Sequence, residues 1–329
     1  MILVIGGAGY IGSHTVKELL QQGHRVVVLD NLSTGHHNSL DKRVVFEKGN
    51  FGNLQDLDRV FSRYSVDAVI HLGCSHPDEH MVRDANQYYM DYVNSMLMLL
   101  YKMKEYHIPE IVFSSTSEVY GVHHSENVTE QAKVAQAIPY HRSQQIIEQF
   151  LEEFHQEYGL NYIILRYFNA AGAAGEIGED HEPEAHLIPM VLKHALKETD
   201  ESLVLDASYA YSREYLHVTD VAKAHVLCIE RLLAGNALNT VYNLGSGQAA
   251  SVKDIVLACR DLTGVQADVV YEMHEAKLTV SYQKIQQELG WNPVHSLEET
   301  IYSAWQWHKL HPEGYGMREI VVPEKLVHI

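Results

Sequence analysis

Cysteine is scarce in this sequence, and long apolar runs are absent. The three cysteines, Cys74, Cys228 and Cys259, lie far apart and form no Cys-x-x-Cys pair. An odd, widely spaced set does not favour a disulfide framework and is typical of reduced thiols in a cytoplasmic protein. No run of about 18 or more apolar residues occurs, so we expect no membrane span. We also expect no signal peptide, because a strand-like run begins at Met1.

Basic side chains are also in short supply. The chain has 25 lysines and arginines against 43 aspartates and glutamates, which gives a formal net charge of −18 at pH 7. A strongly acidic surface repels nucleic acids and anionic lipids, so we expect neither a nucleic acid nor a membrane as a partner. An anionic substrate is not excluded, because it requires only a local group of donors.

Metal-binding motifs are absent, although the chain has 22 histidines. His36-His37 and His123-His124 are adjacent pairs, and the other histidines are scattered. None belongs to an HExxH motif or to a Cys/His cluster. We therefore expect no metal site and interpret these histidines as solvated surface residues.

Strand and helix patterns alternate through the first third of the 329-residue chain. We expect strands at Met1–Ile5, Arg25–Leu29, Val44–Glu47, Ala68–Leu72 and Ile111–Ser114, and helices at Tyr10–Gln22, Leu54–Tyr64 and Asp84–Tyr106. Such alternation indicates a parallel sheet with helices on both faces. The fold class is therefore α/β, with a Rossmann-type doubly wound sheet.

A glycine-rich loop, Gly6 to Gly12, follows the first strand and opens the first helix. Glycines at 6, 9 and 12 fit the dinucleotide-binding fingerprint, because small residues let the backbone turn tightly and approach a pyrophosphate. The helix N-terminus then offers amides to the phosphates. Asp30 follows the second strand, where a carboxylate accepts from ribose hydroxyls and repels a 2′-phosphate. The pattern predicts NAD as the cofactor; the structural alternative for Asp30 is an ordinary strand-end turn.

The second half of the chain returns repeatedly to the expected sheet. A helix at Tyr140–Tyr158 and a strand at Tyr162–Arg166 precede a loop rich in Gly, Ala and acidic residues, 172–184. Further helices are expected at Asp220–Leu233, Val252–Leu262 and Leu297–His308. With no repeat and no linker, we expect an NAD-binding domain at 1–167 with a return at about 214–245. Residues 168–213 and 246–329 would form a smaller, interleaved substrate-binding lobe.

Several segments resemble one family in order. They are MILVIGGAGYIGSHTVKELL, LDNLSTGH, FSSTSEVYG, LRYFNAAGA, GEIGEDHEPEAHLIP, YNLGSGQAASVKDI, LGWNP and WQWHKLHPEGY. Together they resemble the UDP-glucose (UDP-galactose) 4-epimerases, which are extended short-chain dehydrogenases/reductases. The resemblance covers almost the whole chain.

The resemblance implies a mechanism and a set of site residues. NAD takes a hydride from C4 of a UDP-hexose, a tyrosine removes the hydroxyl proton with help from a Ser or Thr, and the 4-keto sugar rotates before the hydride returns. By position, Tyr140 matches the base and Thr116 the helper, although a partly buried aromatic and a strand-end hydroxyl are the structural alternatives. The implied cofactor-binding residues are Gly6, Gly9, Tyr10, Ile11, Gly12, Asp30, Asn31, Asn50, Tyr140 and Tyr167. The implied substrate-binding residues are Asn169, His186, Leu187 and Arg213.

The chain departs from the family pattern at one catalytic position. The family's Tyr-x-x-x-Lys reads Tyr140-His141-Arg142-Ser143-Gln144, so Gln144 stands where the lysine is expected. An ammonium about 5 Å from a phenol, at an effective dielectric of about 20, contributes about 3 kcal/mol, or about two pKa units. Its loss leaves less tyrosinate at neutral pH, although Gln144 still has an amide to donate to the nicotinamide ribose. Arg142 lies on a different helix face and is a poor replacement.

Other departures cluster near the expected cofactor and diphosphate. Asn50 replaces an aspartate after the third strand, Tyr92 replaces an asparagine, and His71-Leu72-Gly73-Cys74 replaces His-Phe-Ala-Ala. Segment 271–276 lacks the arginine and the glycine of the family's Arg-Arg-x-Gly-Asp-Pro, and the loop at 207–211 is short.

Two functional hypotheses follow. The first is an NAD-dependent nucleotide-sugar epimerase, and the second is a catalytically impaired pseudoenzyme that binds NAD or a nucleotide sugar in a regulatory or partner role. Turnover of UDP-galactose and extraction of bound NAD discriminate between them. The resemblance also implies a homodimer that pairs the helices at 84–106 and 140–158.

Overall fold

A computed structural model describes most of the chain. It covers residues 1–73, 89–121, 125–134, 139–197, 202–205, 212–236, 238–264, 269–270 and 277–316. Cys74, His123-His124, the short loop at 207–211, the segment at 271–276 and the first residues of the helix expected from Asp84 lie outside the described residues.

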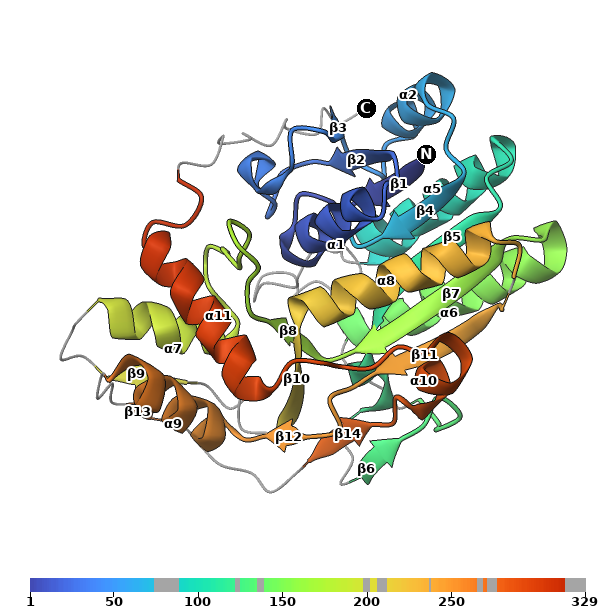
Figure 1. Cartoon of the computed structure of the whole chain (residues 1–329). Coiled ribbons are helices and arrows are strands. Elements are labelled where there is room, and N and C mark those ends of the chain that lie inside the picture. The colour runs from blue at the N-terminus through green and yellow to red at the C-terminus, as the bar shows by residue number, and fades with distance from the viewer. Residues whose placement is uncertain are drawn as a thin grey trace.

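A seven-stranded sheet with the order β11-β7-β5-β4-β1-β2-β3 forms the centre of the molecule (Figure 1). All its neighbouring strands pair in parallel. The strands are β1 (Ile2–Ile5), β2 (Val26–Asp30), β3 (Val45–Lys48), β4 (Ala68–His71), β5 (Glu110–Thr116), β7 (Asn161–Tyr167) and β11 (Thr240–Leu244). This arrangement confirms the expected α/β doubly wound fold.

Helices cover both faces of this sheet because side chains alternate along each strand. Ile2 and Val4 of β1 face one core with α1 (Tyr10–Gln21) and α8 (Val218–Leu233). Leu3 and Ile5 face the other core. That second core is closed by α2 (Leu54–Arg63), α5 (Asn94–Glu105) and α6 (Pro139–Tyr158). The alternating apolar strands therefore fix which helix lies on which side.

A second group of elements packs beside the carboxyl ends of the sheet strands (Figure 1). It contains β8 (Asn169–Ala171), β10 (Arg213–His217) and β12 (Ala249–Ala250), which form a three-stranded sheet. It also contains α7 (Leu187–Leu196), α9 (Val252–Thr263) and α11 (Leu297–Leu310), which share an apolar core. The division into an NAD-binding domain at 1–167 and a substrate-binding lobe stays a prediction.

The remaining elements are short. They are β6 (Ser125–Val128), β9 (Leu203–Val204), β13 (Val269–Val270), β14 (Leu278–Val280), α10 (Gln283–Leu289), the 3₁₀ turns η1 (His37–Ser39) and η3 (Ser117–Tyr120), and the π-helical turn η2 (Tyr89–Val93). In the described part of the chain, no helix has both the length and the apolar character that a membrane span requires.

Helix α7 is the main element that the sequence pattern did not predict. Its sequence, LIPMVLKHAL, is apolar along most of its length, so it carries no clear 3.6-residue alternation. Pro189 is compatible with this helix because it lies in the first helical turn, where its missing N–H has no intrahelical partner to lose.

Candidate active site

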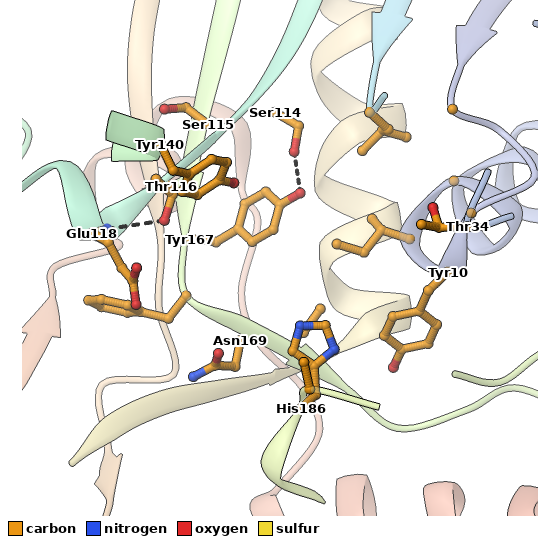
Figure 2. Close-up of a pocket in the computed structure, with 18 of the residues that line it drawn as sticks. Tyr10, Thr34, Ser114, Ser115, Thr116, Glu118, Tyr140, Tyr167, Asn169 and His186 are labelled. Carbon is orange, nitrogen blue, oxygen red and sulfur yellow. Dashed lines mark hydrogen bonds between the residues drawn. The ribbon is translucent and has the colours of Figure 1, made fainter. Parts of the chain in front are cut away.

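A cleft of about 410 Å³ opens at the carboxyl ends of the central strands (Figure 2). Parallel strands of one sheet end at the same edge, so residues distant in sequence meet there. The cleft gathers most of the predicted site residues: Gly6, Gly9, Tyr10, Ile11, Gly12, Thr116, Tyr140, Tyr167, Asn169, His186, Leu187 and Arg213. A smaller hollow of about 80 Å³ shares Gly6 and Gly9 with it and adds Asp30, Asn31 and Asn50.

The glycine loop has no room for side chains. Gly6 has a φ of +74°, and a Cβ placed there would lie 2.6 Å from the backbone nitrogen of Gly73. A Cβ at Gly12 would lie 2.1 Å from the carbonyl oxygen of Gly6. Gly9 is the N-cap of α1 and has no side chain with which to cap the first amides of the helix. These features fit a pyrophosphate at the N-terminus of α1.

Asp30 ties the end of β2 to this loop. Its Oδ2 accepts from the Ala8 N–H at 2.9 Å, and its Oδ1 accepts from the Leu32 N–H at 2.8 Å. Burial raises the pKa of the Asp30 carboxyl, and the two backbone donors partly oppose that rise. Each carboxylate oxygen has a second lone pair, so the same side chain retains acceptors for ribose hydroxyls. Asp30 thus has a structural role that does not conflict with the predicted NAD site.

Asn50 also lies at the predicted adenine end. Its Oδ1 accepts from the Gly52 N–H at 2.9 Å, which fixes the turn after β3. The side-chain oxygen is therefore used locally, while the residue still lines the smaller hollow with Asn31. An asparagine in place of the aspartate of the family pattern removes one negative charge from this end of the site.

Thr116 and Tyr140 reach the cleft from β5 and from the first turn of α6. Figure 2 shows both on one side of the cleft, with Tyr10 on the opposite side. The Thr116 Oγ1 accepts from the Glu118 N–H at 3.2 Å and caps η3. The Tyr140 ring meets the edge of the His141 ring, with centroids 5.5 Å apart. Thr116 therefore caps the backbone of η3, which is the structural role that the sequence left open for it. It also lines the cleft on the same side as Tyr140, the predicted base.

Gln144 lies one turn further along α6, behind the cleft wall. Its side chain is 1% exposed, and its Nε2 donates to the Tyr92 hydroxyl at 3.4 Å. Among the described residues that line the cleft, Tyr92 is included and Gln144 is not. The Tyr92 ring packs near Phe51 and His71, with centroids 6.4 and 6.2 Å away. Tyr92 and Gln144, which depart from the family pattern at two separate positions of the sequence, thus contact each other in the structure.

Arg213 does not face the cleft as a lone cation. One of its guanidinium nitrogens lies 3.1 Å from a carboxylate oxygen of Glu118, and His141 pairs closely with the other oxygen. All three side chains line the cleft. Sequence reasoning missed Glu118 and His141, although each is next to or near a predicted residue: Glu118 follows Thr116 by two positions, and His141 follows Tyr140 directly.

His186 and Leu187 begin α7 on the far wall of the cleft. Burial lowers the pKa of His186, but the close Glu179 carboxylate outweighs it and raises that pKa to about 9. His186 is therefore positively charged at neutral pH. Asn169 of β8 pairs with Tyr215 of β10 and faces the same space.

The Tyr167 side chain closes the floor of the cleft. Its hydroxyl forms a close hydrogen bond with the Ser114 hydroxyl (Figure 2). His71 was not predicted to take part, yet it also lines the cleft. Its buried ring nitrogens have no hydrogen-bond partner among the described residues, and burial lowers its pKa to about 3. His71 is therefore a neutral ring at the back of the site.

A buried ion pair holds α6 in place behind these residues. The Arg166 guanidinium of β7 binds both carboxylate oxygens of Glu148 on α6. Glu148 also accepts from the Ser115 hydroxyl at 2.6 Å, and Arg166 donates to the Tyr120 hydroxyl at 2.9 Å. The network connects β5, β7 and α6, so it sets where α6 presents Tyr140.

The sequence matches one family model, described as the NAD dependent epimerase/dehydratase family, over residues 2–245. It is also 41% identical over 327 residues to the UDP-glucose 4-epimerase of Halalkalibacterium halodurans, with 96% of this chain and 97% of the relative covered. The chain belongs to this epimerase family. The resemblance inferred from the motifs is therefore confirmed, and so is the expectation of an NAD-dependent family.

Solved structures of family members match the fold closely. One crystal structure of a UDP-glucose 4-epimerase superimposes with a TM-score of 0.90 at 36% identity, covering 96% of this chain and 99% of that one. The UDP-glucose 4-epimerase of Bifidobacterium longum, solved in complex with NAD+ and UDP, gives a TM-score of 0.87 at 30% identity, with 95% and 99% covered. The epimerase fold is thus retained over nearly the whole length of the chain.

Proposed function

We propose that this chain is an NAD-dependent nucleotide-sugar epimerase that interconverts UDP-glucose and UDP-galactose at C4. The observation that carries the proposal is the meeting of the glycine loop, Thr116 and Tyr140 in one cleft of a chain from an NAD-dependent epimerase family. The cleft volume of about 410 Å³ is within the usual range for small-ligand sites. NAD, when bound, would supply the hydride acceptor for the C4 carbon.

The proton chemistry would belong to Tyr140 and Thr116. Tyr140 would remove the proton of the C4 hydroxyl and later return it. The Thr116 Oγ1 already accepts from the Glu118 N–H, so its own hydrogen is left to donate toward the substrate oxygen or Tyr140.

The UDP group would lie on the opposite wall, against Asn169, His186 and Leu187. His186 caps α7 without a side-chain hydrogen bond, so the first amides of α7 are not satisfied by its side chain and suit an anionic or carbonyl acceptor. Arg213 would have to exchange Glu118 for a phosphate oxygen. That exchange replaces one charged hydrogen bond by another, so its net free-energy change is small.

The rate of this epimerase would be limited by Gln144. Gln144 brings no charge to Tyr140, and its amide is directed to Tyr92. General acid–base catalysis contributes on the order of 10²–10⁴ in rate, and that contribution falls when the pKa of the base is far from the working pH. The proposal therefore predicts retained NAD binding with slow interconversion.

The test combines two measurements on the purified chain. UDP-galactose is incubated with the protein and the UDP-glucose formed is quantified, and NAD is extracted from the denatured protein. UDP-glucose formation that disappears in Tyr140→Phe supports the proposal. Bound NAD without any interconversion over hours would overturn it in favour of the pseudoenzyme, and absence of both would remove the cofactor assignment as well.

We also propose a homodimer formed through α5 and α6, which lie against one another on one face of the sheet (Figure 1). Met96, Leu100, Ile147 and Leu151 point into the core of the protomer. The interface would therefore use outward residues such as Tyr101, which is 57% exposed. Sedimentation velocity at micromolar concentration tests the assembly, and a single monomeric species would refute it.

A further inference from the structure

Four metal-ligating side chains meet in the loop before α7. Glu179, His181, Glu184 and His186 each offer one ligand atom, and these four atoms all lie within 4.8 Å of one another. Sequence analysis found no metal motif because the spacing, Glu-x-His-x-x-Glu-x-His, matches no helical pair. The loop folds back on itself and brings the four side chains together.

Glu179 is at the centre of this cluster. It is 4% exposed, and its Oε1 pairs closely with the Nδ1 of His186. The same oxygen lies 3.3 Å from the Nδ1 of His181, and that nitrogen is buried without a well-oriented hydrogen bond among the described residues. Glu184 approaches His181 at 4.0 Å. Two imidazole nitrogens and two carboxylates thus converge on one small volume.

This donor set matches a divalent transition metal. Zn²⁺ in proteins binds imidazole nitrogen at about 2.0–2.1 Å and carboxylate oxygen at about 2.0–2.2 Å, in tetrahedral geometry. Such bonds place neighbouring ligand atoms about 3.3–3.6 Å apart, so small side-chain rotations suffice from the present spacing. Two carboxylates also balance the charge of a divalent cation. The imidazoles bind a metal in their neutral form, so the ion would displace the proton of His186 into solvent.

Hydrogen bonds around the cluster hold the loop and orient its ligands. The Gly178 N–H donates to the Tyr315 hydroxyl at 3.0 Å, and the Asp180 carboxylate accepts from the Tyr315 N–H at 3.0 Å. Lys193 of α7 donates to the second oxygen of Glu184 at 2.9 Å. The first oxygen accepts from the Ala185 and His186 N–H groups at 3.1 and 3.2 Å, which holds it on the side of His181. Outer hydrogen bonds of this kind orient metal ligands.

We propose that Glu179, His181, Glu184 and His186 form a structural binding site for a divalent transition metal, with Zn²⁺ as its preferred occupant. The ion fixes the loop that contributes His181, His186 and Leu187 to the wall of the cleft. It takes no part in the chemistry at Tyr140. The proposal stands independently of the proposed epimerase activity.

The experiment uses full-length protein without a histidine tag, stripped with a chelator and then titrated with ZnCl₂ in a calorimeter. We expect one site with a Kd below about 1 μM and a rise in Tm on loading, because an ion that binds only the native state stabilises it. X-ray absorption of the loaded protein should show two imidazoles among four light-atom ligands.

His181→Ala is the informative variant, because its side chain is 22% exposed and its removal disturbs the core little. It should weaken Zn²⁺ binding at least 100-fold, and Glu179→Gln should do the same if it folds. The control is His24→Ala, which removes one histidine from an isolated His24–Glu230 pair at 2.8 Å and should leave the affinity unchanged. Binding weaker than about 100 μM, or binding that His181→Ala leaves intact, would overturn the proposal and assign the metal to scattered surface histidines.

Discussion

The two ends of the cleft are built from different parts of the chain. The end beside α1 is made largely of backbone: Gly6, Gly9 and Gly12 and the first amides of the helix. The opposite end is made of side chains, among them Thr116 and Tyr140. The backbone end requires only that Cβ atoms be absent, and every required glycine is present. The side-chain end requires particular charges, and there the chain departs from its family at Gln144.

This difference explains how the cofactor end of the site can keep the family pattern while the catalytic end departs from it. A pyrophosphate bound by amides and a helix dipole does not depend on the identity of neighbouring side chains. A general base depends on a neighbouring charge for its pKa. Changes at the two ends should therefore separate cofactor binding from turnover.

The largest expected effect comes from Tyr140→Phe at the side-chain end. Removal of the phenolic oxygen leaves no base at this position, so the rate of UDP-galactose conversion should fall on the order of 10²–10⁴-fold relative to the unmodified chain. NAD affinity should change less than threefold. Tyr158→Phe, at an exposed position of the same helix, is the matched control and should keep full activity. Equal losses in both variants would remove Tyr140 from the chemistry.

Gly12→Val tests the backbone end. Its Cβ would lie 2.1 Å from the Gly6 carbonyl oxygen, which cannot move without disturbing the loop. We expect at least a 100-fold loss of NAD affinity by calorimetry, with a lower Tm. Gly9→Ala is the milder companion, because its Cβ meets only the Gly6 oxygen at 3.3 Å. If Gly12→Val bound NAD as tightly as the unmodified chain, the loop would not be the pyrophosphate site.

A third prediction concerns Glu214, a buried carboxyl next to Arg213. It is 1% exposed and accepts from the Gly247 and Val280 N–H groups at 2.7 and 3.2 Å, yet burial raises its pKa from 4.5 to about 7. The folded chain therefore binds this proton more tightly than the unfolded chain does. The stability that the group contributes is present below about pH 4.5 and is lost as pH rises through about 7.

Urea unfolding at pH 5 and pH 8 measures this effect. From pH 5 to pH 8, the free energy of unfolding of the unmodified chain should fall by on the order of 3 kcal/mol more than that of Glu214→Gln, because the glutamine cannot titrate. Taking the difference between the two pH values cancels any pH-independent cost of the substitution. If the difference in unfolding free energy between the two proteins did not change with pH, the pKa of Glu214 would lie near its ordinary value.

The sequence predicted the backbone end more completely than the side-chain end, for a physical reason. Strand and helix periodicity located β1, α1 and β2, and the glycine spacing follows from local geometry alone. The contact between Tyr92 and Gln144 joins two helical segments about fifty positions apart, and the pairing of Arg213 with Glu118 joins strand β10 to the 3₁₀ turn η3. Such contacts depend on tertiary packing, which residue spacing does not encode.

The smallest expected effect is also the sharpest test of the comparison, because it concerns the Tyr92–Gln144 contact. Gln144→Lys restores the residue type that the family pattern calls for, but the new ammonium would be buried behind the Tyr92 ring, where desolvation lowers its pKa. We expect this variant alone to raise the rate less than threefold. Tyr92→Asn removes the ring whose hydroxyl accepts from Gln144 and replaces it with the smaller residue of the family pattern. Together with Gln144→Lys, it should raise the rate at least tenfold over either single variant.

The four proteins form a double-mutant cycle for UDP-galactose conversion. The coupling is about 1.4 kcal/mol if the double variant is tenfold faster than one single variant and the other single variant keeps the unmodified rate. Phe51→Leu, which alters the same aromatic cluster without touching Gln144, is the control and should show no coupling to Gln144→Lys. If Gln144→Lys alone restored a fast rate, the position of Gln144 behind the wall would not matter, and the missing charge would be the whole deficit. If neither variant nor their combination helped, the deficit would lie at the diphosphate side of the cleft.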